Sequence, residues 1–140
     1  MYDSPSNTFF MDTGVATEWG KEPAEEVIEF LGSRQRIGMV HFRNVIVVQT
    51  PETSSATALC ADSGRLHYIE TFVNEGDADM AACMSALVET GYTGGVDPDH
   101  TPHLLEDDVD TPLGWTLALG YIAALRDIYC SQVSWGTARL

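Results

Sequence analysis

The feature that most constrains the fold is an alternation of short apolar stretches with segments of helical pattern. Residues 37–42 (IGMVHF) form a largely apolar run, which is typical of a strand buried on both faces. We expect further strands over residues 9–11 and 95–97, and helices over residues 23–31, 77–90 and 112–130. Strands and helices in this order predict an α/β fold with about three parallel strands joined by right-handed crossovers.

One excursion interrupts this alternation. Residues 45–49 and 66–71 each have the composition of a strand, and they flank a loop rich in Thr, Ser and Ala. We therefore predict a β-hairpin excursion over residues 43–72, standing above the main sheet, within a single domain that covers residues 1–140.

The charge balance excludes several classes of partner. The 140 residues contain 21 acidic and seven basic side chains, for a formal net charge of −14. A nucleic-acid backbone or an anionic membrane surface is therefore not expected as a partner. The single lysine, Lys21, and the dense carboxylates resemble the surfaces of salt-adapted proteins, although an ordinary acidic protein has the same composition.

The cysteines indicate a reducing compartment, and the hydropathy pattern predicts no membrane span. Cys60, Cys83 and Cys130 are odd in number and lack the spacing of a disulfide framework or a zinc site. No stretch reaches the roughly 18 apolar residues of a membrane span, and no leader pattern is present. A cytoplasmic protein is expected.

The lengths of the connections predict where a functional site lies. The helix-to-strand links are short and the strand-to-helix loops are long, so Asp12, His41 and the pair Asp99 and His100 are expected at the carboxyl ends of three adjacent parallel strands. Asp12, His41 and Asp99 together offer the oxygen and nitrogen ligands of a divalent ion such as Mn²⁺, Fe²⁺, Co²⁺ or Zn²⁺. Each of them can equally be a loop cap or a hydrogen-bonded polar residue.

Other polar residues have weaker signals. Arg43 follows His41 by two positions, so it can bind an anionic substrate or pair with a nearby carboxylate. His67 and His103 are expected to be solvated, and the acidic run at residues 106–108 is expected to be a solvated loop because it lacks the calcium-loop pattern.

A series of short motifs resembles the C-terminal third of the mannonate dehydratase family. The motifs are HFR at 41–43, ETF at 70–72, EGDADM at 75–80, GY at 91–92 and PDH at 98–100, followed by a helix start with Gly, an aromatic residue and Thr. Each motif is weak, but their order is fairly specific, and they cover roughly residues 9–130.

The resemblance implies a fold, a reaction and a set of roles. The fold would be the C-terminal part of a (β/α)8 TIM barrel, and the reaction the dehydration of D-mannonate to 2-dehydro-3-deoxy-D-gluconate in hexuronate catabolism. On the family pattern, His41 and Asp99 fall at metal-ligand positions, His100 at a proton-transfer position and Arg43 near the sugar-acid substrate. Mn²⁺ is the expected cofactor, with Fe²⁺ or Co²⁺ as alternatives.

The chain departs from the family pattern at three positions. Asp12 replaces a cysteine ligand, Asp97 replaces an arginine, and Trp115 replaces a tyrosine with a proton-transfer role. Asp12 still binds metals but prefers harder ions, whereas an indole is neither an acid nor a base at ordinary pH. These departures leave open a different metal-dependent sugar isomerase or epimerase, or a non-catalytic remnant.

The length is the largest departure. A (β/α)8 barrel typically needs about 250 residues, so three strands form only an incomplete barrel. We expect the chain to be inactive alone and to need either the missing N-terminal strands or self-association.

Overall fold

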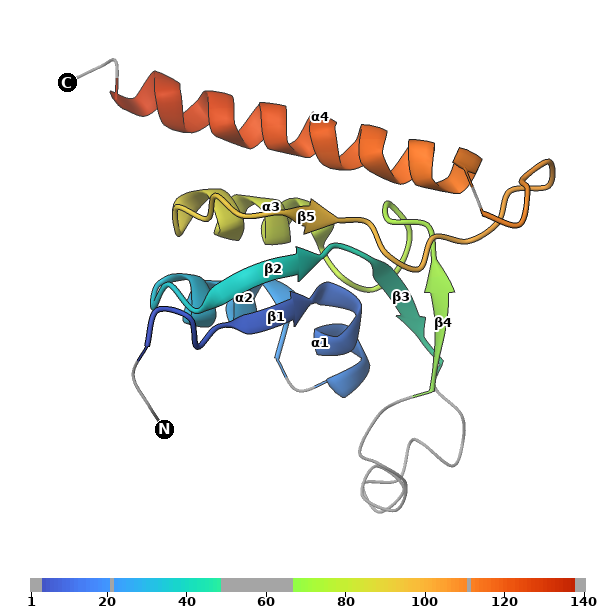
Figure 1. Cartoon of the computed structure of the whole chain (residues 1–140), viewed down its shortest axis with the longest axis horizontal. Coiled ribbons are helices and arrows are strands. Elements are labelled where there is room, and N and C mark those ends of the chain that lie inside the picture. The colour runs from blue at the N-terminus through green and yellow to red at the C-terminus, as the bar shows by residue number, and fades with distance from the viewer. Residues whose placement is uncertain (1–3, 21, 49–66, 111, 138–140) are drawn as a thin grey trace, which may run out of the picture.

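The computed structural model describes residues 4–20, 22–48, 67–110 and 112–137. In this part of the chain, three parallel strands lie side by side, with a separate hairpin beyond their carboxyl ends and a long helix after them (Figure 1). The elements in order are β1 (Phe9–Asp12), α1 (Thr13–Trp19), α2 (Ala24–Gly32), β2 (Ile37–His41), β3 (Asn44–Val47), β4 (Tyr68–Thr71), α3 (Met80–Glu89), β5 (Val96–Asp97) and α4 (Pro112–Thr137).

The main sheet has the order β1-β2-β5 and is parallel throughout its described strands. This confirms the predicted α/β arrangement with three adjacent parallel strands. In the register, Asp12 lies beside His41, and His41 lies beside Asp97. Because neighbouring residues in register point to the same side of a sheet, these three side chains share one face.

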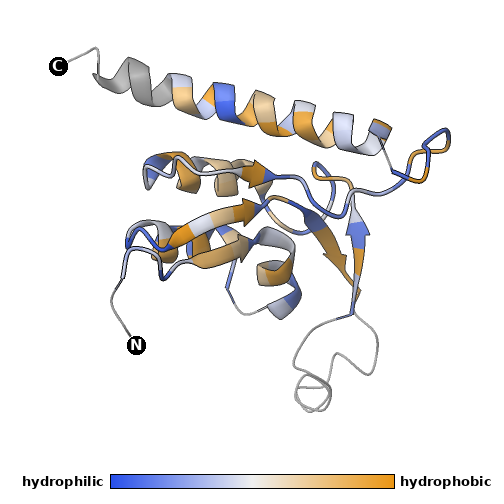
Figure 2. Ribbon diagram, in the orientation of Figure 1, coloured by the Kyte–Doolittle hydropathy of each residue, from blue (hydrophilic) through white to orange (hydrophobic). Residues whose placement is uncertain are grey.

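The two faces of the sheet differ in burial. Met11 and Val40 point to a side covered by the helices and belong to the core, with Ile28 of α2, Leu87 of α3 and Ile122 of α4. The opposite face carries Phe10 and Met39, and the side chain of Phe10 is 56% exposed. The expected burial of β2 on both faces is thus found on one face only, since the described helices cover one side. Figure 2 shows hydrophobic colouring along β1 and β2, and hydrophilic colouring in the loops around them.

The hairpin is formed by β3 and β4, which pair antiparallel outside the main sheet. Its strands correspond to those predicted over residues 45–49 and 66–71, while the residues between them, 49–66 with Cys60, lie outside the described residues. Asn44 fixes the hairpin to the following segment, because its side-chain amide donates to the carbonyl of Ala78 and its Oδ1 accepts from the backbone N–H of Ala78.

Helix α1 was not expected from the sequence, which predicted a loop after Asp12. Asp12 is the N-cap of this helix, because its Oδ1 accepts a hydrogen bond from the N–H of Val15 at 2.9 Å. Gly20 ends the helix in the left-handed conformation, with φ of 59°. The other helices match their predictions within a few residues, except that α4 extends to Thr137. Among the described helices, none has the length and hydropathy needed to cross a membrane.

Asp107, in the run predicted to be a solvated loop, caps α4. Its carboxylate accepts hydrogen bonds from the backbone N–H groups of Leu113 and Gly114, at 2.9 and 3.1 Å, and of Leu104. Residue 111, which directly precedes this helix, lies outside the described residues. Desolvation raises the pKa of Asp107, but the three backbone hydrogen bonds and the charge of His103 outweigh it, so the pKa is lowered.

Replacing Asp107 by asparagine is expected to lower Tm by a few degrees at neutral pH. A carboxyl whose folded-state pKa is lowered stabilises the protein above its unfolded-state pKa, and this stabilisation is lost as the pH falls through the folded-state value. The difference between Asp107→Asn and the unaltered protein should therefore shrink under acid conditions. Thermal melts between pH 7 and pH 3 measure this. Glu106→Gln is the control, and an equal effect of Glu106→Gln would contradict the capping role.

Cys83 lies in the core, and its thiol is expected to be inert in the native protein. Desolvation, together with the charges of Glu25 and Asp79, raises the pKa of Cys83 to about 12. The thiolate fraction near pH 8 is then roughly 1,000-fold lower than for a thiol of ordinary pKa. Treatment with iodoacetamide, followed by peptide mapping, should show alkylation of the exposed Cys130 but not of Cys83 until the protein is unfolded. Comparable native rates at the two cysteines would refute this expectation.

Candidate functional site

The carboxyl ends of the three parallel strands bring together the residues predicted to form the site. Asp12 ends β1, His41 ends β2, and Asp99 and His100 follow β5. One potential ligand atom from each of Asp12, His41 and Asp99 lies within 4.8 Å of the others. The predicted convergence at this edge of the sheet is therefore found.

The three side chains are partly accessible and contact each other directly. His41 Nδ1 lies 2.9 Å from Asp99 Oδ2 and 3.8 Å from Asp12 Oδ2. The side chains of His41, Asp12 and Asp99 are 25%, 15% and 23% exposed. The ring of Phe10 packs edge-on against the imidazole of His41, with the two centroids 4.3 Å apart. The cluster is thus held on one side by protein and is open to solvent on another.

Arg43 lies beneath this cluster and pairs with carboxylates, which is one of the two alternatives from the sequence. Its Nε lies 3.0 Å from Asp12 Oδ2, and its Nη2 lies 2.7 Å from Glu18 Oε1. The third guanidinium nitrogen, Nη1, is buried, makes no hydrogen bond within the described part of the chain and lies 3.6 Å from Glu70 Oε1. Gly14 permits this packing, because a Cβ at position 14 would lie 2.5 Å from Nη1.

Thr13 fixes the backbone that carries His41 and Arg43. Its hydroxyl donates to the carbonyl oxygen of Arg43 at 2.6 Å and accepts from the backbone N–H of Arg43 at 3.1 Å. Thr13 is fully buried at the start of α1. The first turn of α1 therefore connects the end of β1 to the end of β2.

His100 lies at the rim of the cluster, in contact with two carboxylates. Its Nε2 lies 3.1 Å from Asp99 Oδ2, and its Nδ1 lies 3.0 Å from Glu70 Oε1. Asp99 and His100 both have left-handed backbone conformations, with φ of 37° and 43°. Consecutive non-glycine residues in this region are uncommon and are often found at functional sites.

Two residues of this network, Glu18 and Glu70, were not predicted as site residues. Glu18 is fully buried on α1, and its only sequence signal would have been its place in a helix that was not expected. Glu70 stood within the ETF motif but was given no role. His67 and His103 are exposed and do not belong to the group of three, whereas Asp97 and Trp115 are half-buried.

The donor set fits a hard or borderline divalent ion. Two carboxylates and an imidazole are the ligands that Mn²⁺ and Fe²⁺ accept, and none of the three is a thiolate. Asp12 Oδ1 is engaged by the N-cap hydrogen bond and Oδ2 by Arg43, so Oδ2 would serve both the guanidinium and an ion.

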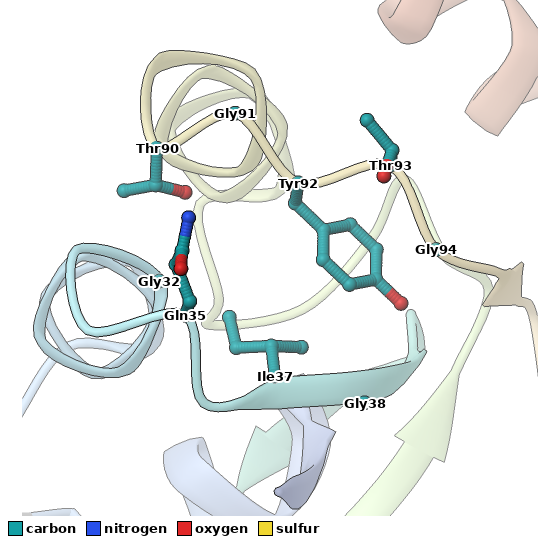
Figure 3. A pocket seen from close by; sticks show the side chains of 9 residues that line it. All are labelled: Gly32, Gln35, Ile37, Gly38, Thr90, Gly91, Tyr92, Thr93 and Gly94. Carbon is teal, nitrogen blue, oxygen red and sulfur yellow. The ribbon is translucent and has the colours of Figure 1, made fainter. Parts of the chain in front are cut away.

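A hollow lies at the opposite end of the strands, and its lining residues include no acidic or basic side chain. It has a volume of about 300 Å³ and is lined by Gly32, Gln35, Ile37, Gly38, Thr90, Gly91, Tyr92, Thr93 and Gly94 (Figure 3). Close packing explains two of its glycines. A Cβ at Gly32 would lie 2.5 Å from the hydroxyl oxygen of Thr90, and one at Gly94 would lie 2.3 Å from that of Tyr92.

Comparison with known protein families shows to which family this chain is related. The family model of D-mannonate dehydratase (UxuA) matches residues 1–132. The chain belongs to this family. The mannonate dehydratase of Streptococcus equi subsp. zooepidemicus is 31% identical over 117 residues, which cover 80% of this chain and 27% of the relative. The mannonate dehydratase of Lachnoclostridium phytofermentans is 30% identical over 132 residues, which cover 92% of this chain and 32% of the relative.

A solved structure agrees with this relationship. The crystal structure of mannonate dehydratase from Streptococcus suis serotype 2 matches with a TM-score of 0.71 and 27% identity, over 95% of this chain and 35% of that one. The family resemblance inferred from the ordered motifs is thus confirmed. The chain spans about a third or less of the length of the curated mannonate dehydratases described above.

Proposed function

We propose that this chain supplies the C-terminal part of the active site of a metal-dependent mannonate dehydratase. The observation that carries the proposal is the convergence of Asp12, His41 and Asp99 at the carboxyl ends of three parallel strands. In barrel enzymes, active sites lie at this end of the strands. The reaction is the dehydration of D-mannonate to 2-dehydro-3-deoxy-D-gluconate.

The reaction removes the proton next to the substrate carboxylate and expels the neighbouring hydroxyl, which leaves as water. Asp12, His41 and Asp99 would hold the divalent ion, for which Mn²⁺ is our first choice. When bound, such an ion supplies positive charge that stabilises the negative charge developing on the substrate. His100, whose side chain is 54% exposed beside the cluster, transfers the proton.

Arg43 is proposed to bind the anionic substrate through the positive charge of its guanidinium, which lies buried beneath the cluster. Its Nη1 makes no hydrogen bond to the described residues, whereas Nε and Nη2 are engaged by Asp12 and Glu18. A positive charge beneath the strand ends attracts the carboxylate of a sugar acid. The same guanidinium would then position Asp12 and bind the substrate.

The fold around the site is proposed to be the C-terminal part of a (β/α)8 barrel, with the hairpin as an excursion from it. β1 and β5 form the edges of the described sheet, and no described helix covers the face that carries Phe10 and Met39. In a complete barrel, this face would line the interior. A mainly apolar groove of about 540 Å³ lies between α3, β5 and α4, with Val96, Leu119 and Ile122 among its lining residues. Further strands and helices of the barrel would cover these surfaces.

The test restores the missing part of the barrel. The chain is fused behind the N-terminal two thirds of the Lachnoclostridium phytofermentans relative, and Mn²⁺-dependent formation of the keto product from D-mannonate is measured. We expect turnover by the fusion, none by its His100→Ala variant and none by the chain alone. Turnover of other sugars or sugar acids in place of D-mannonate would favour an isomerase or epimerase. Absence of both turnover and metal binding would leave a non-catalytic remnant.

A further inference from the structure

Glu70 on strand β4 is the hairpin residue that reaches the site. We propose that Glu70 is a positioning residue that fixes the orientation of the His100 imidazole, an inference that rests on the proposed role of His100. Glu70 Oε1 lies 3.0 Å from His100 Nδ1, and the Glu70 side chain is 34% exposed. The contact joins two segments that are 30 positions apart in the sequence.

The contacts within its own loop do not fix the orientation of the His100 side chain. Asp99 and His100 adopt left-handed backbone conformations, which are unfavourable for L-residues. The side chain of His100 is 54% exposed, so burial alone does not restrict its rotamer. Its other ring nitrogen contacts Asp99, the neighbouring residue in the same loop. Glu70 therefore supplies the contact from a separate element.

Contacts of the hairpin outside the site fix the position of Glu70. Glu70 lies opposite Val45 in the register of β3 and β4, and the side chain of Val45 is fully buried. The backbone carbonyl of Val45 accepts from the N–H of Asp77, and Asp77 Oδ2 accepts from the N–H of Val47. These bonds do not involve the strand-end cluster, so the hairpin holds Glu70 in place independently of the site.

Pairing with Arg43 does not by itself account for Glu70. The distance between Glu70 Oε1 and Arg43 Nη1 is 3.6 Å, which is too long for a hydrogen bond. Asp12 and Glu18 already lie within 3.0 Å of the guanidinium. The shorter contact of Glu70 is to His100, at 3.0 Å, and this contact carries the proposed positioning role.

The contact can be tested on the chain itself without metal or substrate. In long-range ¹H–¹⁵N spectra recorded with a chelator present, the ring signals of His100 are assigned with a His100→Gln variant. Glu70→Gln is expected to shift the His100 ring nitrogens more than those of any other histidine, whereas Glu75→Gln, the control outside the network, leaves them unchanged. Unchanged His100 signals in Glu70→Gln would overturn the proposal.

A reciprocal measurement covers the case in which Glu70→Gln disturbs the hairpin. In His100→Ala, the side-chain carboxyl ¹³C signal of Glu70 should move while that of Glu75 does not, and an unmoved Glu70 signal would also overturn the proposal.

Activity gives a separate readout. In the fused enzyme described above, Glu70→Gln should lower kcat about tenfold or more with a smaller change in KM, because the proton-transfer group is misplaced rather than the substrate lost. An unchanged kcat in an active fusion would refute the positioning role. If the fusion shows no turnover although the spectra respond, the proposed function fails and the contact between Glu70 and His100 stands.

Discussion

Replacing Asp99 by asparagine is expected to weaken Mn²⁺ binding by about 100-fold or more. Asp99 Oδ2 lies 2.9 Å from His41 Nδ1 and 3.1 Å from His100 Nε2, so this one oxygen contacts both imidazoles of the site. An amide keeps the size of the side chain but removes its negative charge. Asparagine also tolerates the left-handed conformation of position 99, where φ is 37°. The variant thus removes the negative charge of the proposed ligand without adding backbone strain.

Titration calorimetry and the electron paramagnetic resonance signal of free Mn²⁺ measure the affinity. Asp110→Asn is the matched control, because Asp110 is an exposed carboxylate in the loop before α4 and loses the same charge. Both variants should have an unchanged Tm to within a few degrees. Equal Mn²⁺ affinity in Asp99→Asn, Asp110→Asn and the unaltered chain would contradict a metal site at the strand ends.

The convergence of Asp12, His41 and Asp99 was predictable because it depends on chain order. Three parallel strands place their carboxyl ends at one edge, and the long loops that follow them were visible in the sequence. The register then brings Asp12 beside His41 with no further information. The ordered motifs, two of which contain His41 and Asp99, indicated the family.

The surroundings of the cluster were not predictable in the same way. Helix α1 has seven residues, too few for an apolar period to stand out, so the sequence around Gly14 was interpreted as a loop. The pairing of Glu18 with Arg43 joins residues 25 positions apart and leaves no local signal. Asp107 caps a helix that begins five positions later, which lies outside the usual N-cap spacing.

The buried pair of Arg43 and Glu18 is expected to dominate the stability of this region. Glu18 is fully buried, Arg43 is 6% exposed, and their nearest atoms are 2.7 Å apart. Desolvation lowers the pKa of Arg43, but the hydrogen bonds and charges of Glu18 and Asp12 outweigh it and raise the pKa above its ordinary value. The guanidinium therefore stays charged, and its removal takes a positive charge from 2.7 Å beside a buried carboxylate.

Arg43→Met should lower the free energy of unfolding by about 3–5 kcal/mol, as measured by urea denaturation at neutral pH. The double variant Arg43→Met, Glu18→Leu should recover a large part of this loss, because apolar side chains of similar volume often replace a buried ion pair without cost. Arg126→Met is the control. Its guanidinium is 60% exposed and pairs with the neighbouring Asp127, so a change within about 1 kcal/mol is expected. If Arg43→Met costs no more than Arg126→Met, the stabilising role of the buried pair is refuted.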